Sequence, residues 1–237
     1  LDLVNNVLDM NKLESGEVRL EKKQFHLLDL FRETILLVEM QAVERNVALQ
    51  VEICEGEHWD VMESPVHLRQ VLQNIISNAV KYNRAGGSVS VRVQEIASTE
   101  QTATFEFVCQ DTGIGMSEEF QKRAFEPFAQ EHTDARSVYN GTGLGMAIVN
   151  TLVHKMNGTI EVSSTEGKGS TFIITLPFEV AQEKKKVESL PEEETPSISG
   201  LSLLLAEDNE LNAEIAEVLL KDEGAHITLV KDGQQAV

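Results

Sequence analysis

Residues 74–82 read Asn74-Ile75-Ile76-Ser77-Asn78-Ala79-Val80-Lys81-Tyr82. They continue a helical pattern that begins at Ser64-Pro65, where a capping hydroxyl precedes a proline whose missing N–H costs nothing at the first helical position. Four side chains of this stretch share one helix face, at spacings of i, i+4, i+7 and i+8. They are Asn74, Asn78, Lys81 and Tyr82. A solvated polar face is the common explanation of such a pattern, so its meaning depends on the rest of the chain.

The same side chains have the chemistry of a phosphate and base site. An asparagine oxygen can ligate Mg²⁺, which prefers oxygen ligands and keeps several waters. A lysine supplies a point charge for phosphate, and a tyrosine ring offers a flat apolar surface for a base.

Two glycine motifs lie further along: the first follows a predicted strand, and the second ends a polar loop and opens a predicted helix. The first is Asp111-Thr112-Gly113-Ile114-Gly115-Met116, and the second is Gly141-Thr142-Gly143-Leu144-Gly145. A carboxylate at a strand end can accept a hydrogen bond from an exocyclic amine, and glycines let a ligand approach the backbone. Free N–H groups at a helix start favour phosphate. The second motif is neither a P-loop nor a dinucleotide fingerprint, because it lacks Gly-Lys-Ser/Thr and Met146 follows it. An ordinary turn and a ligand-free hinge remain the alternatives.

A polar segment separates the two glycine motifs. It begins after Phe125-Glu126-Pro127-Phe128, lacks periodicity over 129–142 and is typical of a mobile loop. Arg136 could fold from it over phosphates, although solvation is the usual state of an isolated loop arginine. Hydrophobic periodicity around these motifs predicts helices over 27–46, 117–125 and 143–156, and strands over 47–53, 89–93, 104–108, 160–162 and 170–176.

The two ends of the chain differ from this middle part. Residues 1–14 show a wide apolar helical stripe that needs a partner helix. Residues 179–200 are rich in Lys, Glu and Pro and cannot build a core, so they form a linker. Beyond the linker, 201–237 read as an apolar strand, a helix and a second strand, a βαβ unit cut short.

Composition limits the possible partners and the compartment. The formal net charge of −19 repels nucleic-acid phosphate and anionic membrane surfaces. Cys54 and Cys109 have no metal or disulfide spacing and are expected to be buried, reduced thiols of a cytoplasmic protein. No apolar run approaches the ~18 residues of a membrane span, and no signal peptide is present. Because the chain begins at Leu1, we expect a segment of a longer protein, whose missing upstream part could anchor it in the cell membrane.

The four motifs, in this order, resemble those of the catalytic ATP-binding domain of sensor histidine kinases over residues 63–178. Residues 70–82 are similar to its N box, 111–116 to its first glycine box, 125–128 to its F box and 141–145 to its second glycine box; 167–172 match its final turn and strand. The resemblance implies an α/β fold of the α+β two-layer sandwich type, with a mixed sheet packed on helices, and Mg²⁺ and ATP as cofactors. Departures are mild: Asn83 and Met146 replace the usual Thr or Ser and Leu.

The resemblance also implies a role for each motif residue. Asn78 would hold the Mg²⁺ that bridges the phosphates, assisted by Asn74, and Lys81 would face phosphate. Tyr82 would pack on adenine, Asp111 would bind its amine, and Gly113, Gly115 and Met116 would line the base pocket. The loop would contribute Phe128, Arg136, Gly141, Thr142, Gly143, Leu144 and Gly145 to ATP binding.

The flanks resemble other parts of a hybrid kinase. Residues 1–16 look like the end of the dimerisation and phosphoacceptor hairpin, 17–178 would be the catalytic domain, 179–200 the linker and 201–237 the start of a flavodoxin-like receiver domain. Glu207 and Asp208 would belong to the receiver's incomplete Mg²⁺ site. Implied partners are a second copy through the hairpin and a cognate receiver or phosphotransfer domain. None of the 6 histidines has the phosphoacceptor context, so this segment should not phosphorylate itself.

Two other functions compete with this one. Gyrase-type and chaperone-type ATPases look similar, but they carry a water-activating Glu where this chain has Asn74, an amide that cannot take a proton. A degenerate, non-catalytic nucleotide-binding interaction module would keep the same motifs without transferring phosphate.

Overall fold

The computed structural model describes residue 8 and residues 20–131, 142–181, 200–206 and 210–231. The chain divides into two compact units, Leu1–Gln182 and Glu183–Val237, and each is described by itself. The predicted helix over 1–14 and most of the predicted linker lie outside the described residues.

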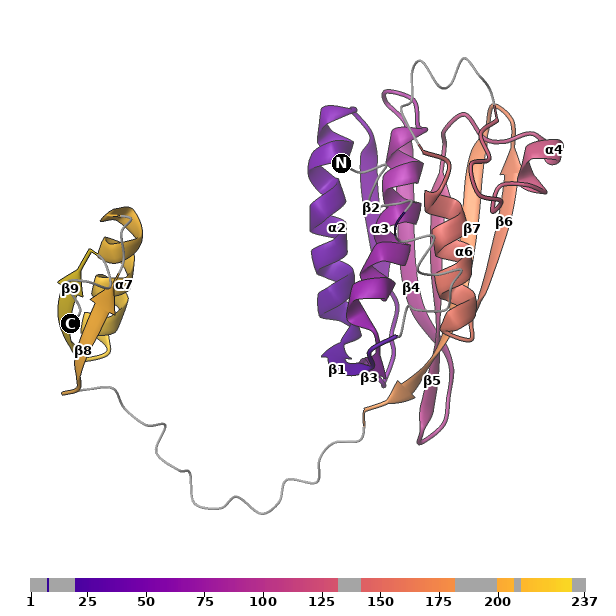
Figure 1. Ribbon diagram of the computed structural model, residues 1–237. Helices are drawn as coiled ribbons and strands as arrows, with labels where there is room; N and C mark the ends of the chain where they lie inside the picture. The colour runs from indigo at the N-terminus through magenta and orange to yellow at the C-terminus, as the bar shows by residue number, and fades with distance from the viewer. Residues whose placement is uncertain (1–7, 9–19, 132–141, 182–199, 207–209, 232–237) are drawn as a thin grey trace. The chain divides into compact units, whose positions relative to one another are not determined.

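A seven-stranded sheet forms one layer of the first unit (Figure 1). Its strand order is β1-β3-β7-β5-β4-β2, and β6 also pairs with β7. The strands are β1 Lys23–His26, β2 Ala48–Ile53, β3 Asp60–Glu63, β4 Ser88–Ser98, β5 Thr102–Asp111, β6 Thr159–Thr165 and β7 Gly169–Val180. Only the β2–β4 pair is parallel among these described strands, so the sheet is mixed.

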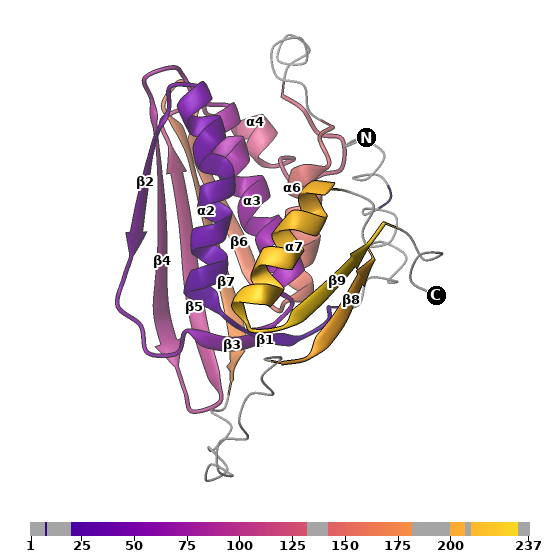
Figure 2. The ribbon, with the colours of Figure 1, turned by 90° about the vertical axis from the view of Figure 1, so that its left-hand side faces the viewer.

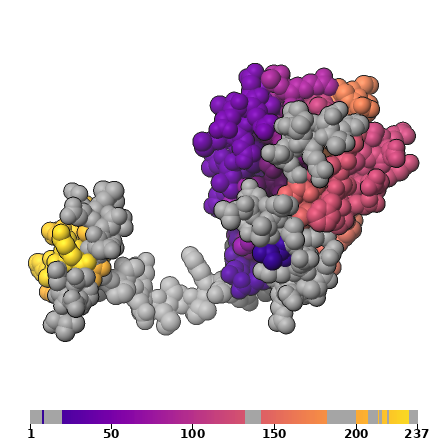
Figure 3. All heavy atoms as spheres, turned by 45° about the horizontal axis from the view of Figure 1, so that its top comes forward, coloured from indigo at the N-terminus to yellow at the C-terminus, as the bar shows by residue number. Residues whose placement is uncertain are grey.

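Three helices form the second layer, on one face of this sheet (Figure 2). They are α2 Leu27–Glu44, α3 Pro65–Lys81 and α6 Gly145–Lys155. A one-turn helix, α4 Glu118–Gln121, lies by β6. This arrangement confirms the predicted two-layer α/β sandwich. In the space-filling view α2 lies at the violet edge of the unit (Figure 3). Leu36 and Met40 of this helix are exposed.

The core lies between the two layers, because strand and helix periodicities meet there. Every second residue of a strand points to one face, and Val89, Val91 and Val93 are each at most 1% exposed. From the helical side, Ile75 and Ile76 of α3 pack against this face with at most 2% exposure. The same burial that fixes α3 on the sheet turns its polar side chains away from the sheet.

Some local predictions were wrong. The helix predicted over 117–125 ends at Gln121, although Ser117 caps it as expected by accepting a hydrogen bond from the Phe120 amide. Ser64 precedes α3 but its hydroxyl makes no cap; it lies 2.7 Å from the His67 ring nitrogen Nδ1. Both cysteines are free thiols, of which Cys109 is buried and Cys54 is half-buried.

The second unit is a small β–α–β element. Strands β8 Ser202–Ala206 and β9 His226–Val230 pair in parallel, with α7 Glu210–Asp222 between them in the chain. This confirms the secondary structure predicted for 201–230. None of the described helices in either unit is both long and apolar enough to cross a membrane.

Candidate functional site

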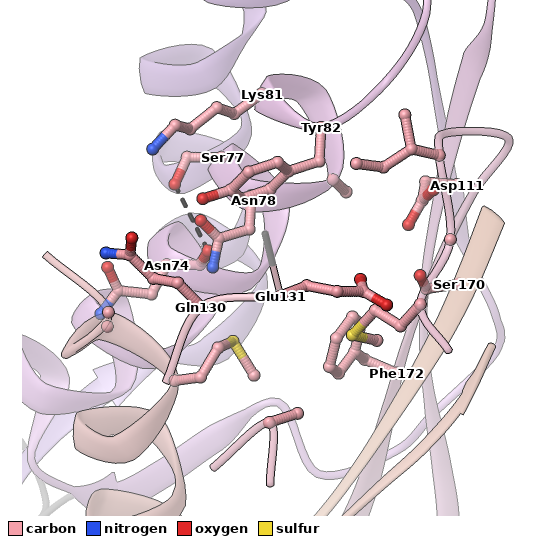
Figure 4. Close-up of a pocket in the computed structure, with 18 of the residues that line it drawn as sticks. Asn74, Ser77, Asn78, Lys81, Tyr82, Asp111, Gln130, Glu131, Ser170 and Phe172 are labelled. Atoms are coloured by element: carbon pink, nitrogen blue, oxygen red, sulfur yellow. Dashed lines mark hydrogen bonds between the residues drawn. The ribbon is translucent and has the colours of Figure 1, made fainter. Parts of the chain in front are cut away.

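A cavity of about 610 Å³ opens beside α3 in the first unit (Figure 4). Its walls come from one face of α3, the end of β5, the start of β7, the C-terminal end of α2, and the segments on either side of residues 132–141. Segments distant in sequence therefore meet at one place, and three of the four sequence motifs contribute lining residues.

The α3 wall carries the polar face predicted from the sequence. Asn74, Asn78, Lys81 and Tyr82 all line the cavity, together with Ser77. The Lys81 ammonium lies 5.0 Å from the centre of the Tyr82 ring, a cation–π contact. Burial lowers the pKa of Lys81, and the nearby positive charge of Arg45 lowers it further.

Asp111 lies at the other side of the cavity, at the end of β5 (Figure 4). It is 8% exposed, and its Oδ1 accepts a hydrogen bond of 2.7 Å from the Gly113 amide. Burial raises the pKa of this carboxyl, and hydrogen bonds from the Gly113 and Ser170 amides offset part of the increase. Its neighbours in the wall include the apolar side chains of Met116 and Phe172. A buried acceptor beside an apolar slot suits a flat base with an exocyclic amine.

Two glycines are required by the backbone around the cavity. Gly115 has a φ of +67°, and a Cβ there would lie 2.0 Å from the Thr165 carbonyl oxygen. Gly143 has a φ of +71°, and its carbonyl accepts a hydrogen bond of 2.9 Å from the Phe128 amide. A Cβ at residue 143 would collide with the Phe128 backbone at 2.8 Å. Glycine thus permits the close contact that joins the two sides of the loop segment.

The structure brings most, but not all, of the predicted residues to the cavity. Besides the α3 residues, the lining includes Asp111, Gly115, Met116, Thr142, Gly143 and Gly145. Three predicted residues do not line it: the Gly113 amide supports Asp111, Leu144 is fully buried in the core, and Phe128 is 65% exposed. Arg136, Gly141, Glu207 and Asp208 lie outside the described residues.

Several lining residues were missed by the sequence analysis. Gln41, Glu44 and Arg45 come from the end of α2, and Phe120, Gln130, Glu131, Ser170 and Phe172 come from the loop side and β7. The glycine-rich turn before Ser170 was a usable signal, because it starts the strand that borders Asp111. The end of α2 carried no motif, since only the packing of α2 against α3 brings it to the cavity.

Gln121 fastens α4 to the sheet beside the base side of the cavity. Its Nε2 donates to the Ser164 carbonyl and its Oε1 accepts from the Ser164 amide, both at 3.0 Å. The Ser164 hydroxyl in turn accepts a hydrogen bond of 2.8 Å from the Met116 amide. This side-chain pairing holds α4, and with it Phe120, against β6.

A mixed sheet covered by helices on one face, with a cavity that is polar at one end and has a buried carboxyl at the other, defines a nucleotide-binding sandwich. Residues 63–180 match the family described as "Histidine kinase-, DNA gyrase B-, and HSP90-like ATPase". The chain belongs to this family, and the domain is an ATP-binding catalytic domain of the histidine kinase type.

Full-length relatives are much longer than this chain. The autoinducer 2 sensor kinase/phosphatase LuxQ of Vibrio vulnificus is 33% identical over 100% of this chain and 28% of its own length. The circadian input-output histidine kinase CikA of Synechococcus elongatus is 34% identical over 100% of this chain and 30% of its own length. The crystal structure of full-length ShkA in complex with AMPPNP matches with a TM-score of 0.64 and 25% identity, covering 99% of this chain and 46% of ShkA.

Proposed function

We propose that this chain is part of a hybrid sensor histidine kinase, whose cavity binds Mg²⁺–ATP and presents the γ-phosphate to a histidine outside these residues. The polarity of the cavity is the observation that carries the proposal. The amides of α3 and its one lining cation, Lys81, lie at one side, the buried Asp111 carboxyl lies at the other, and the Tyr82 ring lies between them (Figure 4). A nucleotide has the matching order of phosphate, sugar and base.

Each wall would bind a different part of the nucleotide. The Asp111 carboxylate would accept the adenine amine, while Tyr82 and Met116 would cover the base. Lys81 would contact phosphate, and its partial burial, which lowers its pKa, would strengthen that contact. Gly143 precedes α6 and Gly145 begins it, and both lie in the cavity wall, where backbone N–H groups would donate to phosphate oxygens. Arg136 and Gly141 lie outside the described residues, and they remain a proposed phosphate contact and a proposed hinge.

The residues present suit Mg²⁺ held mainly by the nucleotide. The described residues contain no group of three His, Cys, Asp or Glu side chains that could hold a metal by themselves. Mg²⁺ is commonly bound through one or two protein oxygens together with phosphates and waters. The amide oxygens of Asn78 and Asn74, one turn apart on the cavity wall, would supply that share. The ion would neutralise charge on the phosphates.

Positioning is then the main contribution of this chain to the reaction. The γ-phosphoryl group would pass in line to an imidazole nitrogen as its bond to the β-phosphate oxygen breaks and ADP leaves, and then to a receiver aspartate, which frees the imidazole. An imidazole is itself a nucleophile, so no base is needed to activate water. Asn74 agrees with this, because an amide cannot accept the proton of an attacking water, as the Glu of gyrase-type and chaperone-type ATPases does.

We extend the proposal to the flanks and to the parent protein. Residues 1–16 would belong to a dimerising hairpin, 17–178 to the catalytic domain, 179–200 to a linker and 201–237 to a receiver domain. Glu207 and Asp208 would contribute to the receiver's Mg²⁺ site. The domain would work in the cytoplasm, with a receiver or phosphotransfer domain as its partner.

The first experiment is calorimetric titration of this chain with ATP, with and without Mg²⁺. We expect Mg²⁺-dependent binding that Asn78→Ala and Asp111→Ala each weaken at least ~30-fold, about the cost of one or two polar contacts. Phosphotransfer to an added phosphoacceptor hairpin would follow. Nucleotide binding without phosphotransfer would favour the non-catalytic nucleotide-binding module, and absence of binding by folded wild-type protein would leave only an interaction module. Steady ATP hydrolysis without an acceptor would favour the gyrase-like ATPase.

A further inference from the structure

Arg45 follows the last residue of α2 and lies against the end of α3. Its guanidinium Nη1 donates a hydrogen bond of 3.3 Å to the backbone carbonyl of Lys81, the last residue of α3. The carbonyls at a helix C-terminus have no partner within the helix and carry partial negative charge, which attracts a cation. The C-terminal end of α3 therefore holds the Arg45 guanidinium close to the backbone of Lys81.

Both cations belong to the wall of the same cavity. Arg45 and Lys81 are the two cationic side chains among its described lining residues. The two cations are close enough to interact. Burial is the main cause that lowers the pKa of Lys81, and the positive charge of Arg45 lowers it further. Two like charges gain nothing from each other, so the pair is costly unless an anion joins it.

The charges of the lining residues make one end of the cavity positive and the other end negative. Glu44 is the acidic lining residue next to Arg45, so this end carries one net positive charge with Arg45 and none without it. The remaining acidic lining residues, Asp111 and Glu131, have their carboxylates toward the opposite side, where Asp111 lies (Figure 4). The chain as a whole carries a net charge of −19, so the positive charge at this end of the cavity depends on Arg45.

We propose that Arg45 is a second phosphate-binding cation, which acts with Lys81 on the polyphosphate of the nucleotide. Only one of its five N–H donors is used on the Lys81 carbonyl. The planar guanidinium can offer others to phosphate oxygens, a geometry that an ammonium cannot reproduce. This inference rests on the proposed function, and it adds that the end of α2 contributes to selection of triphosphate over shorter phosphates.

The test compares Arg45→Gln with wild type by calorimetric titration with ATP, ADP and adenosine. We expect the affinity of the variant for ATP to be about tenfold lower than that of wild type. The loss should be smaller for ADP and less than about twofold for adenosine, because only the phosphates would contact the missing charge. The loss for ATP should shrink as salt rises. Arg32→Gln is the matched control: Arg32 is an exposed residue of α2 that pairs with Asp29 and does not line the cavity. Arg45→Lys should recover part of the ATP affinity.

The outcomes separate this inference from the function on which it rests. ATP binding that Asn78→Ala abolishes but Arg45→Gln leaves at the level of Arg32→Gln overturns the role of Arg45 alone. Equal losses for ATP and adenosine, with a lower melting temperature, would show that Arg45 only supports the end of α3 and would also overturn it. Failure of wild-type protein to bind ATP would overturn both.

Discussion

Asp111 is a residue whose site chemistry works against folding. Burial raises the pKa of its carboxyl above the value in the unfolded chain, near 3.9, so the folded state binds the proton more tightly. Stability then falls as pH rises through the window between the two pKa values, and the penalty is fully present above the folded pKa. At neutral pH the nucleotide-free protein carries this cost for an acceptor that a ligand would use.

Asp111→Asn should separate the two effects. Asparagine can still accept the Gly113 amide through its oxygen, but it carries no charge to desolvate. We expect the nucleotide-free variant to be more stable than wild type at pH 7, with the gain vanishing below the pKa of the unfolded chain, while ATP binding weakens strongly. Urea unfolding across pH measures the first effect and calorimetry the second. A variant less stable than wild type at pH 7 would contradict the cost assigned to burial.

Glu95 is a buried carboxyl whose hydrogen bonds lower its pKa by more than burial raises it. Its side chain is 6% exposed, and it accepts hydrogen bonds from the His58 ring at 2.8 Å and from the Glu57 and His58 amides at 2.7 and 3.0 Å. Burial alone would raise the pKa of Glu95, but these bonds outweigh it and lower the pKa to about 2. The carboxylate ties the segment before β3 to β4, far in sequence.

Glu95→Gln should therefore destabilise the first unit without affecting its ligand. A depressed folded pKa gives stability that is present above the unfolded pKa, near 4.5, and is lost as pH falls toward about 2. We expect a loss on the order of 2 kcal/mol at pH 7, which disappears at the acid end of that window, and unchanged ATP affinity. Glu52→Gln, at an exposed position of β2, is the control for a lost charge. Equal stability of the two variants would show that the bonds around Glu95 contribute nothing net.

At the scale of elements, α4 is the weakest described helix beside the site. It has one turn, buries none of its own residues, and is held to β6 by the paired hydrogen bonds of Gln121 with Ser164. Gln121→Ala should free α4, raise the hydrogen-exchange rate of its amides and weaken adenosine binding ~3- to 10-fold, because Phe120 leaves the cavity wall. Lys122→Ala, at the exposed next position, is the control. Unchanged exchange in α4 would show that other contacts hold it.

The elements also show which parts of the site a sequence can predict. The face of α3 follows from local spacing, because its apolar residues fix which side meets the sheet, and Asp111 follows from an alternating strand that ends in a glycine turn. Arg45 and Gln121 could not be found this way, since their contacts join segments that are distant in sequence. Leu144 differs from its neighbouring glycines, because it is the N-cap residue of α6 and its side chain turns into the core.

At the scale of the whole molecule, the two units differ in the size of their buried apolar cores. The first unit buries apolar residues from four of its strands and from three helices between two layers. In the second unit the described buried hydrophobic residues are only Ala213 and Ala225, while Leu204 and Leu229 of its strands are exposed. A two-stranded sheet with one helix rarely has independent stability, because it cannot offset the entropy of ordering its chain.

We therefore expect residues 201–237 to exchange their amides rapidly while the first unit stays protected. Hydrogen exchange followed by mass spectrometry would show β8 and β9 deuterated within seconds, and β4, β5 and β7 protected for hours, since these strands lie inside the larger core. Truncation after Gln182 should leave the melting temperature of the first unit and its affinity for ATP unchanged. Slow exchange in β8, or a lower melting temperature after truncation, would show that the second unit gains stability from contacts beyond its own elements.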